Sequence, residues 1–342
     1  MNGFVPRGGR RPNPRGRPPG PPMHRGPRLA PRFDDSPVPD GVIEEILLEA
    51  RELAEKGAIR TAMERAGEAV RLDASRPEGY LLLGEFNLLD GDPDEALRTF
   101  SAARAKAARA RQDFLQDPTE VRLLAATGEG HALRVLGRHK DAALAYAAAL
   151  AEDASDPLGL SVHCCESWLA AGDTVRACGV IPPVDGATPD AHLVAAFACM
   201  RAGQRKEFVV RARLAMLNNL YVLSALVSGE TPDFGLVHGV VDSTPEAARG
   251  FAERLGPIIK ADPSLVDAIA AVAAAPGPAA DMERFLICAK RLTREADPLV
   301  REGITREIDL LRDEARIRAT SDAVLADWDF TDATHGGGEV DV

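Results

Sequence analysis

A helical hydrophobic pattern that recurs around a glycine is the feature of this sequence that most restricts its fold. Residues 41–73 place apolar side chains at helical spacing on both sides of Gly57, and the same pattern returns 34 residues later around Gly91. A period of this length is typical of proteins built from stacked repeats of one supersecondary unit. Since one unit cannot bury its apolar face alone, the sequence predicts an all-α solenoid of stacked helix pairs.

Three more turns continue the pattern with less regular spacing. They fall at Gly137, Gly172 and Gly203, which lie 46, 35 and 31 residues after their predecessors. The first interval exceeds the period by twelve residues, so the basic stretch 103–114 is predicted to be an insertion or a lengthened helix. In the fourth and fifth units the second helix lacks the aromatic residue of the repeat pattern, and the prolines of 181–184 shorten one of these helices.

The second unit resembles the tetratricopeptide repeat, in which a large residue, Leu-Gly, Ala, an aromatic residue and a second Ala follow at fixed offsets. The resemblance extends over about 42–217 and is strongest in the second and third units. It implies antiparallel helices that cross closely at Gly84 and Ala96, while Tyr80 and Phe100 fill the groove against the neighbouring unit. The repeat-signature residues are Gly57, Ala62, Tyr80, Leu83, Gly84, Gly91, Ala96, Phe100, Ala103, Gly130, Gly137, Ala142, Tyr146, Ala149, Gly172 and Gly203.

Composition divides the chain into four segments. Residues 1–39 are rich in Arg, Pro and Gly with almost no large apolar side chain, so they cannot offset the entropy of ordering and are predicted to be disordered. The repeats occupy 40–217, and 218–326 is predicted to be a C-terminal helical region that caps the solenoid. The last residues, 327–342, are predicted to be an acidic flexible tail.

Three helices are expected in the C-terminal region. Thr244 caps a helix over 245–255, and a second helix over 263–275 begins with proline and ends at an Ala-Pro-Gly-Pro sequence. A charged helix over 298–320 carries one apolar stripe. We predict that it is the terminal cap, because a stripe of two heptads is too short for an intermolecular coiled coil.

The charge of the chain is divided as unevenly as its composition. Residues 1–32 hold eight Arg and no acidic residue, so the rest has 33 of the 41 basic residues against 52 acidic ones, a net charge near −19. The N-terminal tail, residues 1–39, resembles the Arg-Gly-Gly segments of RNA-associated proteins. In such segments Arg binds phosphate and stacks on bases without a fixed fold. A solubilising spacer and a proline-rich ligand for aromatic grooves are the alternatives. The predicted nucleic-acid contacts are Arg7, Arg10, Arg11, Arg15, Arg17, Arg25 and Arg28.

A search for catalytic patterns finds no P-loop phosphate motif, no HExxH, no CxxC and no GxSxG. Asp90, Asp92 and Asp94 alternate as calcium ligands do, but Glu95 and Ser101 stand where such a loop needs a glycine and an acid. We therefore predict a polar turn between two helices rather than a calcium site.

The cysteines are predicted to be core residues. His163, Cys164 and Cys165 are adjacent, and neighbouring residues of a helix point about 100° apart, so these three cannot form a tetrahedral metal site alone. Counted from Gly172, Cys165 takes the small position where helices cross, and Cys199 takes a buried position in the next unit. The sequence therefore predicts no catalytic residue, no metal and no cofactor.

The resemblance implies a protein partner, held as an extended peptide or a helix in the groove of the solenoid. The acidic body favours basic partners. Five cysteines without paired spacing, no apolar run long enough to span a membrane and no secretory signal lead us to expect a cytoplasmic protein. We predict a non-catalytic adaptor. The alternatives are an RNA-associated factor acting through its tail and a repeat protein with an enzymatic region in 218–342.

Overall fold

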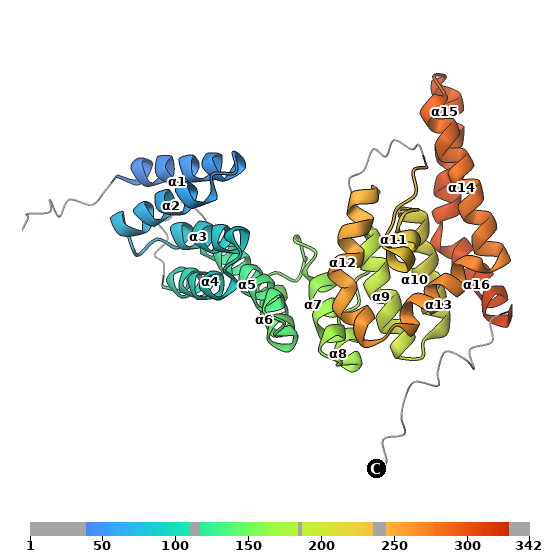
Figure 1. Ribbon diagram of the computed structural model, residues 1–342, viewed down its shortest axis with the longest axis horizontal. Coiled ribbons are helices and arrows are strands. Elements are labelled where there is room, and N and C mark those ends of the chain that lie inside the picture. Colours follow the sequence, from blue (N-terminus) through green and yellow to red (C-terminus); the bar gives the residue numbers. More distant parts are fainter. Residues whose placement is uncertain (1–38, 110–116, 184–186, 235–243, 328–342) are drawn as a thin grey trace, which may run out of the picture. The chain divides into compact units, whose positions relative to one another are not determined.

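The computed structural model describes residues 39–109, 117–183, 187–234 and 244–327 (Figure 1). The chain separates into a unit at Met1–Pro39 and a unit at Asp40–Val342. The arginines predicted to bind nucleic acid, part of the basic stretch 103–114 and nearly all of the acidic tail lie outside the described residues. Every regular element within the described ranges is a helix, so the predicted all-α fold is confirmed.

The helices of Asp40–Val342 follow one another along the chain, and from α1 to α7 each one contacts the next. Sixteen helices are found in the described ranges: α1 (Asp40–Glu55), α2 (Ile59–Leu72), α3 (Pro77–Asp90), α4 (Pro93–Ala107), α5 (Pro118–Val135), α6 (His139–Glu152), α7 (Leu160–Ala170), α8 (Thr174–Cys178), α9 (Pro189–Arg201), α10 (Arg205–Asn218), α11 (Val222–Ser228), α12 (Pro245–Ala261), α13 (Ser264–Ala274), α14 (Pro276–Arg294), α15 (Pro298–Arg312) and α16 (Glu314–Asp327).

One turn geometry joins the two helices of every repeat unit. The glycine of the turn has a φ between 70° and 85° in all five units, a conformation that strains any residue with a Cβ atom. The next residue donates its N–H to the carbonyl five positions back, as Asp92 does to Asn87 at 2.8 Å. The equivalent bonds of the other four turns measure 2.8–2.9 Å. The five glycines are Gly57, Gly91, Gly137, Gly172 and Gly203.

Small residues let neighbouring helices approach two buried aromatic rings. A Cβ atom added at Gly84 would lie 2.6 Å from the ring of Phe100, and one added at Gly128 in the next unit would lie closer still. The ring of Tyr146 meets Gly130 in the same way, at 2.5 Å. Tyr80 and Leu83 are half-buried, and the fully buried signature alanines are Ala62, Ala96, Ala103, Ala142 and Ala149.

The fourth unit departs from the others. Its second helix, α8, has five residues, and Pro182 and Pro183 follow it closely. Proline has no N–H and cannot continue a helix, which accounts for the early end.

The C-terminal region differs from its prediction in three places. Helix α12 continues past 255 through Pro257 to Ala261. The Ala-Pro-Gly-Pro sequence that was expected only to end a helix also begins α14, because Pro276 occupies a first-turn position where no N–H is needed. The single helix expected over 298–320 is broken at Asp313, whose Oδ1 accepts a hydrogen bond from the Arg316 N–H at 2.7 Å and so caps α16.

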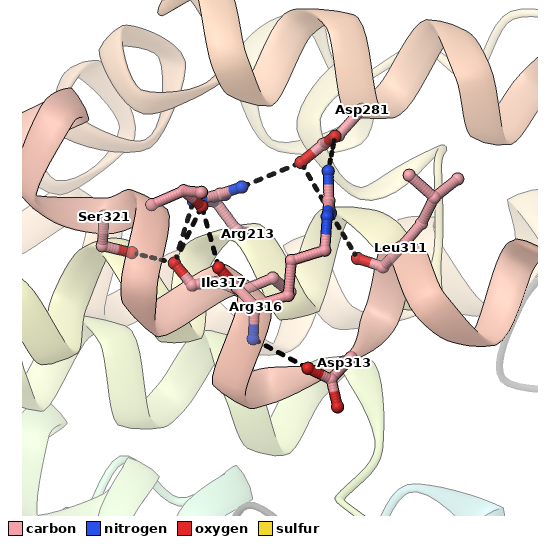
Figure 2. Close-up of polar contacts among 8 residues, drawn as sticks. Arg213, Asp281, Leu311, Asp313, Arg316, Ile317 and Ser321 are labelled. Atoms are coloured by element: carbon pink, nitrogen blue, oxygen red, sulfur yellow. Dashed lines mark hydrogen bonds and ion pairs between the residues drawn. The ribbon is translucent and has the colours of Figure 1, made fainter.

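Polar contacts attach the last helices to α10 (Figure 2). Nη2 of Arg213, on α10, lies 2.8 Å from Oδ2 of Asp281 on α14, and its Nη1 donates to the carbonyl of Ile317 on α16 at 3.1 Å. Arg316 contacts the same carboxylate, with Nη1 3.2 Å from Oδ2. One carboxylate therefore joins three helices.

Candidate protein-binding face

The first helices of the repeat units, α1, α3, α5, α7 and α9, share one helical face at the same distances from the turn glycine. Positions four apart lie on one side of a helix, and we define the first-helix face by the residues six and two positions before each glycine. The residues six positions before are Arg51, Glu85, His131, Glu166 and Phe197, and those two positions before are Glu55, Leu89, Val135, Ala170 and Arg201.

This face carries exposed apolar side chains in the second and third units. Leu89 is 66% exposed and Val135 is 65% exposed, and they occupy equivalent positions on α3 and α5. These two helices contact each other. Burying large apolar side chains is favourable, so two of them at one repeat position mark a surface suited to association.

In the fourth and fifth units α12 covers the same face. Nε of Arg254, on α12, lies 2.9 Å from Oε2 of Glu166, and its Nη2 pairs with Asp190 at the start of α9. Arg201 donates from Nη2 to the carbonyl of Ile258 at 3.5 Å and lies 3.2 Å from Asp262 through Nε. Residues of α12 and Asp262 at its C-terminal end thus bind the first-helix face where the fourth and fifth units present it.

The buried apolar side of α12 makes this contact part of the core. Its fully or nearly fully buried residues are Ala248, Phe251, Leu255 and Ile258. The same hydrophobic cluster includes Trp168 of α7 and Phe197 of α9. The first-helix face is therefore divided between a part under α12, on units four and five, and a part on the preceding units that no described helix covers, called the uncovered part below.

Glu166 is the centre of a buried charge network. It is only 3% exposed, and Nη1 of Arg134 on α5 lies 3.0 Å from its Oε1. Burial alone would raise the pKa of Glu166, but His163, whose Nδ1 lies 3.9 Å from Oε2, and the charges of Arg254 and Arg134 outweigh burial and hold the pKa below its ordinary value. The carboxylate is therefore ionised and joins α5, α7 and α12.

A cluster of three rings lies beside this network. The hydroxyl of Tyr146 and Nδ1 of His131 share a hydrogen bond of 2.7 Å, and the His131 ring lies edge-on to that of His163 with centroids 5.2 Å apart. Burial, followed by the charge of His163, lowers the pKa of His131 to about 4. Burial raises the pKa of Tyr146. Both groups are therefore neutral near pH 7.

The cysteines singled out in the sequence lie inside the repeats. Cys164, Cys165 and Cys199 are buried, and Cys165 donates weakly to the carbonyl of Ala177 at 3.4 Å. Burial raises the pKa of Cys164 to about 11 and that of Cys199 to about 12, so both remain thiols. Among the described residues no group of three or more His, Cys, Asp or Glu side chains is arranged to hold a metal ion.

The aspartates that alternate at 90–94 form a helix turn. Asp92 caps α4, since its Oδ1 accepts a hydrogen bond from the N–H of Glu95 at 2.9 Å. In the parts of the chain that the structure describes, no single helix is long and apolar enough to cross a membrane. The pair α13 and α14 passes that test only together, with a bend of 74° between them.

The charge network was not anticipated from the sequence. Arg134, Glu166 and Arg254 belong to three different helices, and Glu166 is separated from Arg254 by 88 residues. The one available signal was the position of Glu166, six residues before the turn glycine, where it faces whatever covers the first helix. Nothing in the sequence identifies α12 as that cover.

The likeness of this chain to known proteins is one of structure. No family model matches the chain, and no curated protein matches it. The chain is similar in structure to YrrB, described as a TPR protein with an unusual peptide-binding site, with 17% identity, a TM-score of 0.41 and coverage of 52% of this chain and 89% of that one. It is also similar to TTC0263, a thermophilic TPR protein of Thermus thermophilus, with 16% identity, a TM-score of 0.36 and coverage of 53% and 94%.

Proposed function

We propose that this chain, a protein of tetratricopeptide-like repeats, is a non-catalytic scaffold that holds a protein partner on the uncovered first-helix face of α1, α3 and α5. The observation that carries the proposal is the pair of exposed apolar residues at one repeat position, Leu89 and Val135. A partner segment that buries both side chains gains apolar contact on two neighbouring helices at once.

The charges around these residues favour a basic partner. Glu55 and Glu85 are exposed on the same face of α1 and α3, where Arg51 offsets one of the two negative charges, and Glu85 lies one helical turn before Leu89. The chain after residue 32 is strongly acidic, so its field attracts Lys and Arg. The best-fitting partner is therefore a segment with apolar anchors and basic flanks, bound as a peptide or as a helix.

The deeply buried polar groups of the C-terminal region support a structural role for it. Arg213 and Asp281 join helices, and Arg312 donates from Nε to the carbonyl of Leu217 at 2.9 Å while lying over the ring of Phe285. We assign α13 to α16 to closing the solenoid.

The proposal is tested by partner capture from source lysate with ribonuclease present. The double variant Leu89→Glu/Val135→Glu places two acids on the face, whereas Leu310→Glu is a matched control because Leu310 is 64% exposed on α15. We expect the double variant to lose the proteins captured by the wild type and the control to retain them. Equal capture by all three proteins would refute the proposal.

A second function rests on the positive charge of the N-terminal tail, residues 1–39. Eight Arg without an acid in residues 1–32 are suited to bind RNA phosphates, and such binding weakens steeply with salt. We propose this for the tail alone. Titrating single-stranded RNA into the full chain and into a chain that starts at Asp40 tests it, and equal affinities would exclude the tail.

A further inference from the structure

A cavity of about 470 Å³ lies where α12 meets the uncovered part of the first-helix face. It is formed by α5, the start of α6, α7 and α12, and Val135 of the proposed binding face forms part of its wall. Its other apolar walls come from Ala170, Pro257 and Ile258. The volume is within the range of sites that hold small molecules, so it has room for a large side chain.

Two polar atoms at this cavity lack a hydrogen-bond partner among the described residues. They are Oγ of Ser167 and Nδ1 of His139, and both atoms are buried. Ser167 as a whole is 1% exposed. A buried hydroxyl without a partner is costly and is normally satisfied by some group, so Ser167 marks the cavity as a place for a ligand that forms hydrogen bonds.

The charges that line the cavity are balanced and fixed in place. Glu166 binds Nη1 of Arg134 and Nε of Arg254, and the exposed Glu253 adds a second carboxylate. An anionic ligand would meet two carboxylates, and a cationic one would meet two guanidinium groups. A neutral ligand meets neither penalty, and an aromatic ring gains from the planar faces of the arginines.

We infer that this cavity binds a tyrosine side chain of the protein partner. The ring packs against Val135 and Pro257, and the phenolic hydroxyl pairs with Oγ of Ser167 once that buried side chain turns toward the cavity. Tyrosine combines a large apolar ring with one neutral hydrogen-bonding group, which is the combination that this lining requires. The inference rests on the proposed function, because Val135 makes the cavity continuous with the binding face.

The test is an NMR titration in which N-acetyl-tyrosinamide is added to the full chain. The Val and Ile methyl groups of the chain are isotopically labelled. We expect saturable shifts at Val135 and Ile258 and none at Val175, which is 85% exposed on α8. N-acetyl-phenylalaninamide should bind about tenfold more weakly, because it leaves the Ser167 hydroxyl without a partner. The variant Ser167→Ala should abolish this difference.

A second variant separates the cavity from general surface binding. Gly250 lines the cavity, and a Cβ atom there would meet nothing within 4 Å, so Gly250→Leu extends into open space without a backbone clash. We expect Gly250→Leu to lose tyrosinamide binding while its thermal unfolding stays at or above that of the wild type.

Several outcomes would overturn the inference. They are tyrosinamide binding that survives in Gly250→Leu, equal affinity for tyrosinamide and phenylalaninamide, and no saturable shift at Val135 and Ile258. None of these depends on Leu89. If tyrosinamide does not bind the cavity but Leu89→Glu still reduces partner capture, the proposed function stands without the site. If tyrosinamide binds the cavity but Leu89→Glu leaves partner capture unchanged, the site stands and the proposed function fails.

Discussion

The packing of Phe100 against two glycines predicts an unusual pattern of mutational effects. A Cβ atom at Gly128 would clash with three ring atoms of Phe100, which is 2% exposed and has no free space to enter. Overpacking costs about 1–3 kcal/mol, and replacing a helical glycine by alanine gains about 1 kcal/mol. Gly128→Ala should therefore destabilise the protein by about 1 kcal/mol net.

The sign reverses when the ring is removed. In a Phe100→Ala background, which itself costs about 3–5 kcal/mol, the clash is absent and Gly128→Ala should stabilise by about 1 kcal/mol through helix propensity alone. The double-mutant cycle should thus give a coupling of about 2 kcal/mol.

Urea unfolding of the four proteins measures this coupling. Gly303→Ala is the control, because a Cβ atom there meets nothing within 4 Å and the same propensity gain of about 1 kcal/mol should appear in every background. If Gly128→Ala has the same effect with and without the Phe100 ring, the described packing of that ring between the second and third repeat units is wrong.

Three further predictions follow from buried groups. Burial lowers the pKa of His131 and His192 from 6.5 to about 4, so the stability due to these neutral rings is complete above pH 6.5 and is lost as the pH falls toward 4. At pH 5 each histidine should lower the free energy of unfolding by about 2 kcal/mol. Urea midpoints that match at pH 7.5 and pH 5 would contradict this. Asp281→Ala leaves the buried charge of Arg213 without its carboxylate and should lower the free energy of unfolding, measured by heat or urea, by about 3–5 kcal/mol. A decrease below about 1 kcal/mol would show that this pair does not attach the last helices. Burial raises the pKa of Cys165, Cys178 and Cys199, but only Cys178 is half-buried, so a thiol reagent should label Cys178 well before the other two. Labelling of Cys165 first would exclude the packing described here.

The repeat architecture was accessible from the sequence because it is encoded locally. A glycine with positive φ, such as Gly91 or Gly137, recurs at intervals close to one period, and the apolar spacing on each side repeats with it. Gly84 and Phe100 belong to one unit, so a single repeat contains both sides of their contact. Such short-range constraints survive without knowledge of the tertiary structure.

The C-terminal region was predicted less well because its boundaries depend on ambiguous local signals. Pro276 terminates one helix and begins another, and sequence alone favoured the first role. At Asp313 the apolar stripe of α15 continues into α16, and only the capping contact with Arg316 reveals the break. Proline inside α12, at position 257, is tolerated although the sequence suggested an end before it.

The candidate binding face was predicted only as a groove of unspecified extent. Its limit is set by Arg254, whose partners Glu166 and Asp190 lie 88 and 64 residues away along the chain. Local periodicity contains no information on contacts over such distances, so the division of the face between α12 and the open units needed the structure.

Site-specific photo-crosslinking tests the proposed binding face most directly. A photoreactive phenylalanine analogue is placed at position 89, 135 or 310 of the full chain, which are all well exposed, and the chain is irradiated in source lysate treated with ribonuclease. We predict that one and the same protein crosslinks at positions 89 and 135 and that none crosslinks at position 310. A partner captured at position 310 and absent from positions 89 and 135 would contradict the account.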